Sequence, residues 1–447
     1  MKKFTVLVLV ILLSLSILIV SLSGCAEEEG ESGEGVTITV YNCEDYIDEA
    51  TLDEFCLWYE EKYGEPINVN YITYDTNETM LTKLMNNDAD VDVVCASEYA
   101  IQKLLNENLL LPLDKNENMN TINPDIYKRT GNKFGADFEK YFVPYMYGTL
   151  GILYNADIME ENGIDVEELG WGLLWNKSDE AVLDGKILMK DSIRDTFAAG
   201  VLYLKEENAL PEKYKDYSPE DLINCTDSEL VQKVRQALID QKSALKGYEV
   251  DFGKDDLIAQ RAYVDLAWSG DAMYAIEEAE LYNVGLDYYV PEVGANVWFD
   301  GWFIPTVSKH TKEATAFIEF TCLPTVAMSN MVYVGYSSAV QKEVLMNDED
   351  CLAILEENEY DAEEFFDWEV RYPDIDNPNY GMMTDYGASN EMMTIMWEEV
   401  KAATASGSLP MWQISLICLG VIVGLAGILV AIYFVWRHLS FDRRYVK

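Results

Sequence analysis

Apolar and polar positions in the first part of the chain follow two different periods in turn. Val36–Tyr41 and Ile67–Tyr74 place apolar side chains at alternate positions and are rich in β-branched residues, so each predicts a strand. Between them, Thr51–Tyr63 keeps its apolar side chains on one helical face and is followed by Gly64, a typical helix end. The pattern therefore predicts strand, helix and strand, joined by short connections.

The alternation continues along the chain. Val91–Cys95 predicts another short strand. A helix is expected between Ile67–Tyr74 and this strand, and Asn77 is placed to cap its N-terminus. Later segments of the same two kinds are the strands Leu150–Tyr154, Lys186–Lys190 and Ala262–Trp268, and the helices Thr311–Cys322, Cys351–Phe366 and Ser389–Ala403. Strands that alternate with helices indicate a layered α/β fold with a mainly parallel sheet. Such sheets bind ligands at the carboxyl ends of their strands, and the pairs Asp45/Tyr46 and Ser97/Tyr99 stand at two such ends.

The N-terminal segment predicts export. Lys2 and Lys3 precede the apolar run Phe4–Leu22, which is typical of a signal peptide over residues 1–25. The ending Leu-Ser-Gly-Cys resembles the bacterial lipobox, in which cleavage precedes a cysteine that receives a diacylglycerol, so Cys25 is the expected lipid anchor. An uncleaved N-terminal anchor is the alternative. Residues 26–35 consist mainly of Glu, Gly and Ser and predict a flexible tether.

The C-terminal segment predicts a membrane helix. Ile414–Trp436 carries no charge and is about 23 residues long, enough to span a hydrocarbon core of ~30 Å. The tail 437–447 that follows contains four basic side chains, which predicts that it is cytoplasmic. Residues 26–410 are then expected on the extracytoplasmic face of the cell membrane, held by a lipid and by one transmembrane helix.

Composition narrows the function. The net charge of −47, from 79 acidic and 32 basic residues, repels nucleic acid and attracts cations, so nucleic-acid binding is excluded. Only two histidines, His310 and His438, are present, which leaves little material for His-dependent catalysis or metal binding. We therefore predict no metal site and no cofactor. The cysteines show no C-x-x-C spacing, and we expect buried free thiols rather than disulfides.

One stretch carries a candidate recognition site. Residues 294–305 read GANVWFDGWFIP and place Trp298, Phe299 and Trp302 around a single carboxylate, Asp300. A carboxylate near apolar rings is poorly solvated, and both it and the ring faces attract an organic cation. The alternative is a buried strand whose aromatic residues belong to the core and whose Asp300 caps a turn.

An ordered set of short motifs resembles the substrate-binding lipoproteins of bacterial spermidine/putrescine ABC transporters. The motifs, spread over residues 36–403, are NCEDYI, YDTNETMLTKL, DVVCASEYAIQKL, PYMYGTLGILYN, DSIRDTF, WSGDAMYAIEE, WFDGWFIP and VGYSS. The resemblance implies a two-lobe type II periplasmic-binding-protein fold whose lobes are joined by crossing strands. Lobe 1 is then expected over 36–148 and 299–344, and lobe 2 over 149–298 and 345–403.

The resemblance also implies a polyamine in the cleft between the lobes, with rings against its methylene groups and carboxylates at its ammonium groups. Carried over position by position, the aromatic walls are Tyr46, Tyr99, Trp268, Trp298 and Tyr336, the acidic partners are Asp45, Asp195 and Asp300, and Ser97 is a polar contact. A further acid falls on Asp191 or, in another register, on Ser192. Each residue also has a structural reading, such as Asp191 as a helix cap and Tyr336 as core.

Two departures from the family leave the ligand open. Cys43 stands where the family usually has a tryptophan, and no glutamine occurs around 382–384. The expected function is a non-enzymatic, monomeric component of an ABC importer that captures spermidine or putrescine and delivers it to permease subunits. The alternatives are another organic cation or a metal complex in the same fold, a wall-polymer glycosidase with paired carboxylates, and a sensor ectodomain. The preference between putrescine and spermidine is not decided by the sequence.

Overall fold

The computed structural model describes residues 35–403 except for residue 87. The predicted signal peptide 1–25 with Cys25, almost all of the tether 26–35, the predicted transmembrane helix 414–436 and the tail 437–447 lie outside the described residues. Among the helices of residues 35–403, none is by itself long and apolar enough to cross a membrane. The bent pair of helices Thr311–Thr321 and Pro324–Val334 passes that test only when taken together.

The first half of the molecule is built on three parallel strands. β1 (Val36–Cys43) lies between β2 (Ile67–Tyr74) and β3 (Val93–Ser97), and both pair with it in parallel. Helices α2 (Ala50–Tyr63), α3 (Asn77–Met85) and α4 (Glu98–Asn106) follow these strands in turn. The predicted strands and helices are confirmed here, including the helix end at Gly64, which has a φ of 74°. The predicted cap Asn77 is wrong, because the Thr76 side chain accepts the N–H of Thr79.

The second half repeats this arrangement. β6 (Ile187–Lys190) lies between β7 (Leu245–Glu249) and β8 (Val264–Trp268), again with parallel pairing. Helices α8 (Ile193–Glu206) and α10 (Ser228–Gln241) lie between β6 and β7 in the chain, and α12 (Ser269–Glu280) follows β8. An α/β fold with a mainly parallel sheet is thus present in both halves, as the alternating pattern predicted.

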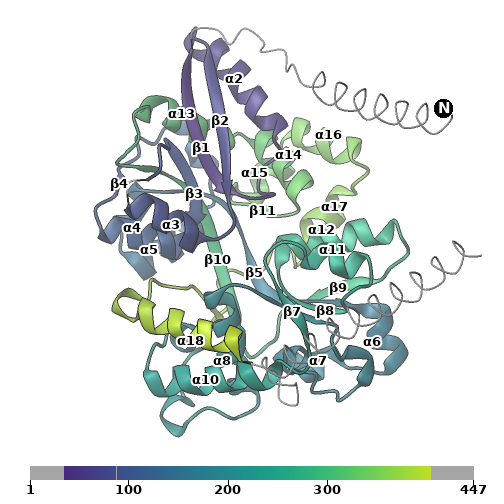
Figure 1. The fold of residues 1–447 in the computed structure, drawn as a ribbon. Helices are drawn as coiled ribbons and strands as arrows, with labels where there is room; N and C mark the ends of the chain where they lie inside the picture. The colour runs from purple at the N-terminus through teal and green to yellow at the C-terminus, as the bar shows by residue number, and fades with distance from the viewer. Residues whose placement is uncertain (1–34, 87, 404–447) are drawn as a thin grey trace, which may run out of the picture.

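Two long antiparallel strands run between the halves and complete both sheets (Figure 1). β5 (Val143–Asn155) pairs with β10 (Ala295–Pro305) through its first part and with β8 through its second part. β10 also pairs with β3, so the strand order is β2-β1-β3-β10-β5-β8-β6-β7. The carboxyl ends of β1, β3, β6 and β8 therefore face the junction between the two halves.

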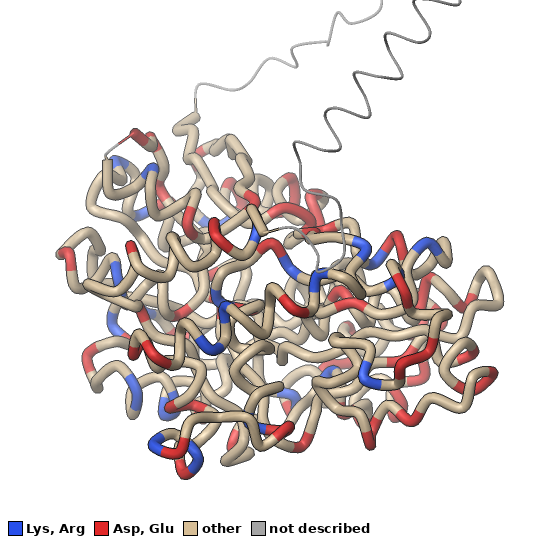
Figure 2. The backbone as a smooth tube through the Cα atoms, turned by 60° about the horizontal axis from the view of Figure 1, so that its bottom comes forward, with Lys and Arg blue, Asp and Glu red and all other residues tan. Residues whose placement is uncertain are grey.

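Most of the remaining helices and strands lie between these central elements or after them in the chain. They are β4 (Leu110–Leu111), α5 (Pro124–Phe134), α6 (Ala156–Asn162), α7 (Val166–Leu169), α9 (Pro219–Ile223), α11 (Gly253–Ile258), β9 (Leu286–Tyr289), α13 (Thr311–Thr321), α14 (Pro324–Val334), β11 (Ser337–Ser338), α15 (Lys342–Met346), β12 (Tyr380–Gly381) and α18 (Asn390–Ala402). Six short 3₁₀ turns, among them Gly170–Trp175, connect them within the described residues. Acidic residues are distributed widely along the described backbone (Figure 2).

The helices after residue 345 differ from the prediction. The single helix expected over 351–366 is divided into α16 (Glu349–Glu357) and α17 (Ala362–Asp367), since Glu359 adopts a φ of 64° between them. These helices also pack with α14 and α15 in the first half, because Cys351 and Phe365 join the apolar cluster of Phe317. The assignment of 345–403 to lobe 2 stays a prediction, and α18 packs on α10 and α8 in the second half.

A substitution at Gly301 tests the close packing of the crossing strands β5 and β10. The pairing of β10 with β5 shifts register between Asp300 and Gly301, and a Cβ on Gly301 would lie 2.6 Å from the Phe142 ring and 2.7 Å from the Val143 carbonyl oxygen. We expect Gly301→Ala to lower the free energy of unfolding by about 1–3 kcal/mol, because inserted methyl groups strain a packed core. Thermal and denaturant unfolding measure this loss.

Gly131, inside α5, provides the matched control. Nothing lies within 4 Å of a Cβ added there, so Gly131→Ala should leave stability unchanged or raise it by up to about 1 kcal/mol. Equal effects of the two substitutions would contradict the packing at Gly301.

Candidate ligand-binding cleft

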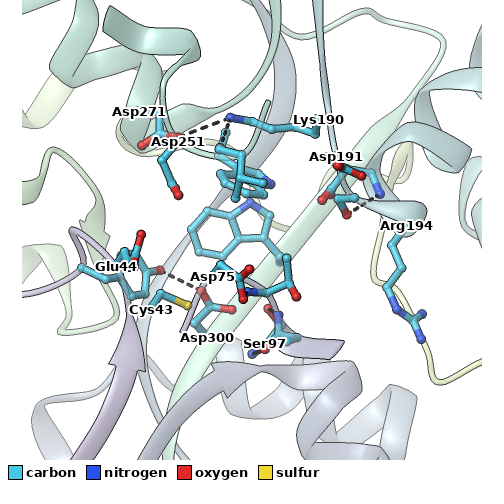
Figure 3. A pocket seen from close by; sticks show the side chains of 18 of the residues that line it. Cys43, Glu44, Asp75, Ser97, Lys190, Asp191, Arg194, Asp251, Asp271 and Asp300 are labelled. Atoms are coloured by element: carbon cyan, nitrogen blue, oxygen red, sulfur yellow. Dashed lines mark hydrogen bonds and ion pairs between the residues drawn. The ribbon is translucent and has the colours of Figure 1, made fainter. Parts of the chain in front are cut away.

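A pocket of about 120 Å³ lies where the carboxyl ends of the parallel strands of the two halves meet (Figure 3). Eleven carboxyl side chains and three cationic side chains line it, so its formal charge is eight negative. The structure brings all ten predicted site residues to this pocket: Asp45, Tyr46, Ser97, Tyr99, Asp191, Asp195, Trp268, Trp298, Asp300 and Tyr336. Their roles as ligand contacts stay a prediction.

Asp300 lies in the middle of β10 and is only 9% exposed. The Tyr46 hydroxyl donates to its Oδ2 at 2.8 Å, while its Oδ1 has no hydrogen-bond partner among the described residues. Burial raises the pKa of Asp300 to about 6, and the hydrogen bonds from Ser97 and Tyr46 oppose that rise. The carboxylate is therefore held by the protein with one oxygen left for another donor.

The aromatic residues of this stretch divide between the pocket and the core. Trp298 and Asp300, two positions apart on the strand, both line the pocket. Phe299 is fully buried, and Trp302, beyond the register shift, packs against Tyr145 and Phe317. The reading of the aromatic residues as core is confirmed for Phe299 and Trp302, but Asp300 does not cap a turn, because it lies within the strand. The reading of the stretch as a recognition site stays a prediction.

Three rings form a wall beside Asp300. Tyr336 lies edge-on to Tyr46, with ring centroids 5.0 Å apart, and 5.6 Å from Trp298. Gly270 permits this arrangement, since a Cβ there would lie 2.1 Å from the Tyr336 ring. Cys43 lines the same side of the pocket, and burial raises the pKa of its thiol well above the usual range. It therefore contributes a neutral, weakly polar surface where the family resemblance implied an indole.

Asp195 occupies the first turn of α8 on the opposite half. The Ser192 side chain caps this helix by accepting the N–H of Asp195 at 3.3 Å. Burial raises the pKa of Asp195, and hydrogen bonding with Ser192 and the charge of Lys190 oppose the rise. Asp195 also contributes to the raised pKa of Asp300, as expected of two carboxylates that share one cavity.

Asp191 has a different environment from the one expected. It does not cap α8, because Ser192 does. Its Oδ1 accepts the Trp397 indole N–H at 3.1 Å and lies 3.5 Å from the Lys401 ammonium, both on α18. Asp191 therefore lines the pocket while its carboxylate is already engaged by the C-terminal helix.

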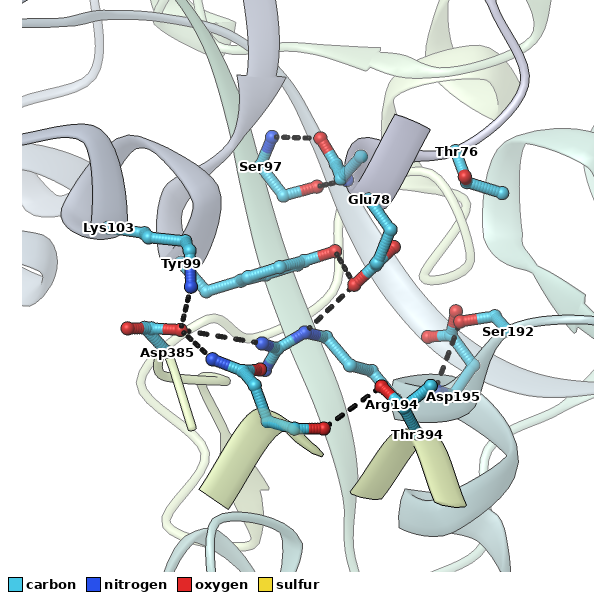
Figure 4. A network of polar contacts seen from close by, with 12 residues as sticks. Thr76, Glu78, Ser97, Tyr99, Lys103, Ser192, Arg194, Asp195, Asp385 and Thr394 are labelled. Atoms are coloured by element: carbon cyan, nitrogen blue, oxygen red, sulfur yellow. Dashed lines mark hydrogen bonds and ion pairs between the residues drawn. The ribbon is translucent and has the colours of Figure 1, made fainter. Parts of the chain in front are cut away.

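Arg194 was missed by the sequence analysis. Its guanidinium lies over the Tyr99 ring, 3.8 Å from the ring centroid (Figure 4). It also lies 4.1 Å from the centroid of the Tyr386 ring. It also donates to Glu78 at 3.3 Å and to the Thr384 carbonyl oxygen at 2.7 Å. Since Tyr99 and Glu78 belong to the first half and Arg194 to the second, these contacts connect the two halves and cover one face of Tyr99.

Two lysines occupy another part of the pocket. The Lys190 ammonium contacts Glu249 at 2.5 Å and Asp271 at 3.6 Å, and it lies 4.4 Å from the Trp268 ring centroid. Lys254 bridges Asp271 at 3.4 Å and Asp45 at 3.5 Å, which again joins the two halves. Lys190 is the last residue of its strand. The rule that ligands bind at the carboxyl ends of parallel strands, which selected Asp45 and Ser97, could therefore have selected Lys190 as well.

Glu98 is a further carboxyl group that the sequence analysis missed. It is fully buried, and its Oε2 accepts the backbone N–H of Phe299 at 3.0 Å. Burial raises the pKa of Glu98 to about 8, so the group is mostly protonated at neutral pH. It anchors β10 to α4 rather than adding a full charge to the cleft.

The chain is similar in sequence to known proteins. The family model described as bacterial extracellular solute-binding protein matches residues 58–350. The spermidine/putrescine-binding periplasmic protein of Escherichia coli is 25% identical over 303 residues, which cover 67% of this chain and 76% of that protein. The putrescine-binding periplasmic protein PotF of Escherichia coli is 28% identical over 319 residues, covering 69% and 79% respectively.

Solved structures share the fold. The structure of a spermidine/putrescine ABC transporter protein from Listeria monocytogenes superimposes with a TM-score of 0.65 and 30% sequence identity. The superposition covers 82% of this chain and 98% of that one. The two-lobe periplasmic-binding-protein fold expected from the sequence is therefore confirmed for the described residues.

Because the pKa of Asp300 is raised, we expect the free energy of unfolding of the ligand-free protein to depend on pH. Because its folded pKa, about 6, lies above the ordinary value of 3.8, the stability associated with the protonated form is present below pH 4 and is lost as the pH rises through 6. Asp300→Asn should therefore gain stability over the wild type between pH 4 and pH 7, by about 1–3 kcal/mol.

Thermal unfolding of both proteins across that pH range measures the gain. Asp216→Asn, at an exposed position, serves as the control and should follow the wild type. A constant difference between Asp300→Asn and wild type from pH 4 to pH 7 would contradict the buried, ionisable state of Asp300.

Proposed function

The chain belongs to the bacterial extracellular solute-binding protein family, and on that basis we propose that it captures polyamines of the spermidine and putrescine class in the cleft. The names of its relatives in Escherichia coli support this ligand class. The cleft supports it independently, because its acidic charge and aromatic walls suit an organic cation with methylene segments.

The observation that carries the proposal is the pair of carboxylates at Asp195 and Asp300. Both are buried, they lie on opposite halves, and within residues 35–403 neither has a Lys or Arg at ion-pair distance. A buried carboxylate without a cation is unfavourable. A diammonium ligand supplies one cation to each half, and its methylene groups replace water against the rings.

The aromatic wall adds affinity and water exclusion. An ammonium group over a desolvated ring gains about 2 kcal/mol, whereas an exposed ion pair contributes only about 0–1 kcal/mol. Trp298, Tyr46 and Tyr336 are all nearly buried, so a cation beside them is shielded from water. The cleft is therefore suited to binding a polyamine, and the chain acts as a binding protein rather than as an enzyme.

Delivery to a transporter completes the proposed role. We infer that the loaded protein acts as a monomer and presents its ligand to the permease subunits of an ABC importer. The lipid on Cys25 and the helix 414–436 would keep it at the extracytoplasmic face of the cell membrane, close to those subunits.

Calorimetric titration of the full-length protein, purified in detergent and dialysed free of amines, tests the ligand class. We expect saturable binding of putrescine, spermidine or both at one site per chain. The absence of binding heat and of thermal stabilisation with both amines would overturn the polyamine proposal and direct the search to other organic cations.

Asp300→Asn tests the main anchor. Removing one partner of a buried charge pair costs about 2–5 kcal/mol, so we expect the Kd for putrescine to rise about 30-fold or more. Glu44→Gln is the matched control, because Glu44 also lines the pocket but is exposed, and its Kd should change by less than about fivefold. Retained affinity in folded Asp300→Asn would remove Asp300 from the site.

A further inference from the structure

The chain places one of its own ammonium groups inside the candidate cleft. Lys190 is 1% exposed, and its Nζ lies 4.4 Å from the Trp268 ring centroid, within the range of a cation–π contact. The same Nζ donates to the Val250 carbonyl oxygen at 2.9 Å and contacts Glu249. The resemblance assigned the Trp268 ring to the ligand, but a protein cation already lies over it.

Two of the carboxylates around Lys190 are in ionic contact with it. Glu249 and Asp271 both contact its ammonium, and Asp271 is shared with Lys254. Burial alone would lower the pKa of Lys190, but the charges of Glu249, Asp265 and Asp271 raise it, so the group is a permanent cation. Figure 3 shows Lys190 and Asp271 together on one side of the pocket and Asp300 on the other.

Lys190 cannot leave this position easily. Lys190 is the last residue of β6. Its ammonium is surrounded by the Val250 carbonyl oxygen, the carboxylates of Glu249 and Asp271, and the Trp268 indole. Lys254, by comparison, is 13% exposed, belongs to the short helix α11, and bridges to the exposed Asp45. Lys254 can move with the rim, whereas Lys190 is part of the buried wall.

We propose that Lys190 occupies the place at which a longer polyamine would put a third ammonium group, and that the cleft therefore selects diamines over triamines. This inference rests on the proposed polyamine function. Asp195 and Asp300 remain for two ligand ammonium groups, whereas a third ammonium near Trp268 would meet a fixed like charge. The ligand class is then short diamines such as putrescine.

Amine analogues test this in the wild-type, full-length protein. Spermidine and N-propyl-1,4-diaminobutane have nearly the same length, but the second lacks the terminal ammonium of the propyl arm. We expect putrescine and the propyl analogue to bind at least about tenfold more tightly than spermidine in calorimetric titration. Spermidine binding as tightly as the propyl analogue, or more tightly, would overturn the inference.

Lys190→Met tests the residue itself. Replacing the ammonium with an uncharged thioether of similar length removes the like charge and leaves Glu249 without its ion partner, while Asp271 keeps Lys254, so the ratio of spermidine to putrescine affinity should rise at least about tenfold. Lys186→Met is the matched control, because Lys186 lies on the same segment but outside the pocket lining, and it should keep the wild-type ratio. An unchanged ratio in folded Lys190→Met would overturn the inference.

The two proposals fail in different ways. If no amine binds the wild type, the polyamine function is wrong and this inference falls with it. If amines bind but spermidine is not disfavoured, the function stands and only the role of Lys190 is rejected. Should Lys190→Met not fold, the wild-type comparison of spermidine with its propyl analogue still decides.

Discussion

Burying a carboxylate costs several kcal/mol unless a cation or hydrogen-bond donors meet it, and the junction between the two halves buries several. Different groups meet this cost at different places. Lys190 pairs with Glu249 and shares Asp271 with Lys254, and the Tyr46 hydroxyl donates to one oxygen of Asp300. Asp300 and Asp195 are among the buried carboxyl groups that have no Lys or Arg at ion-pair distance within the described residues, and in the proposed function their negative charge is the physical basis for binding an organic cation.

The crossing strands position these groups. β10 and β5 run between the halves, and the register shift after Asp300 leaves Trp298 and Asp300 in the pocket while Trp302 packs in the core. Across the pocket, Arg194 stacks on Tyr99 and donates to Glu78, so cation–π and ionic contacts join the halves beside the candidate ligand position. A ligand that bridges Asp195 and Asp300 would strengthen the same closure.

Much of this arrangement could be predicted from the sequence. The alternation of apolar and polar residues predicted the strands at 36–41 and 67–74 correctly, because those segments are half-buried. The ten residues carried over from the resemblance are far apart in the sequence, and all of them line one pocket. The family and the fold are shown, whereas the ligand contacts remain predictions. Local hydrophobic patterns were sufficient to predict the helices and strands. The ordered motifs were sufficient to select residues that line one pocket.

The errors of the sequence analysis concern contacts between distant residues. Lys190 and Arg194 look like ordinary solvated charges in the sequence, and only their partners at Asp271 and Tyr99 make them part of the cleft. Asp191 is held by Trp397, 206 residues later in the chain. The packing of α16 and α17 on α14 and α15 likewise depends on the tertiary position of α14, which no local period reveals.

Proton release on binding tests the central claim that an uncompensated, buried Asp300 anchors an ammonium group. Titrating putrescine into the full-length protein at pH 6, in buffers with different ionisation enthalpies, measures the number of protons exchanged. Since the pKa of Asp300 is about 6 and a bound cation lowers it, we expect release of about half a proton that is absent in Asp300→Asn. Equal proton exchange in wild type and Asp300→Asn would contradict the account.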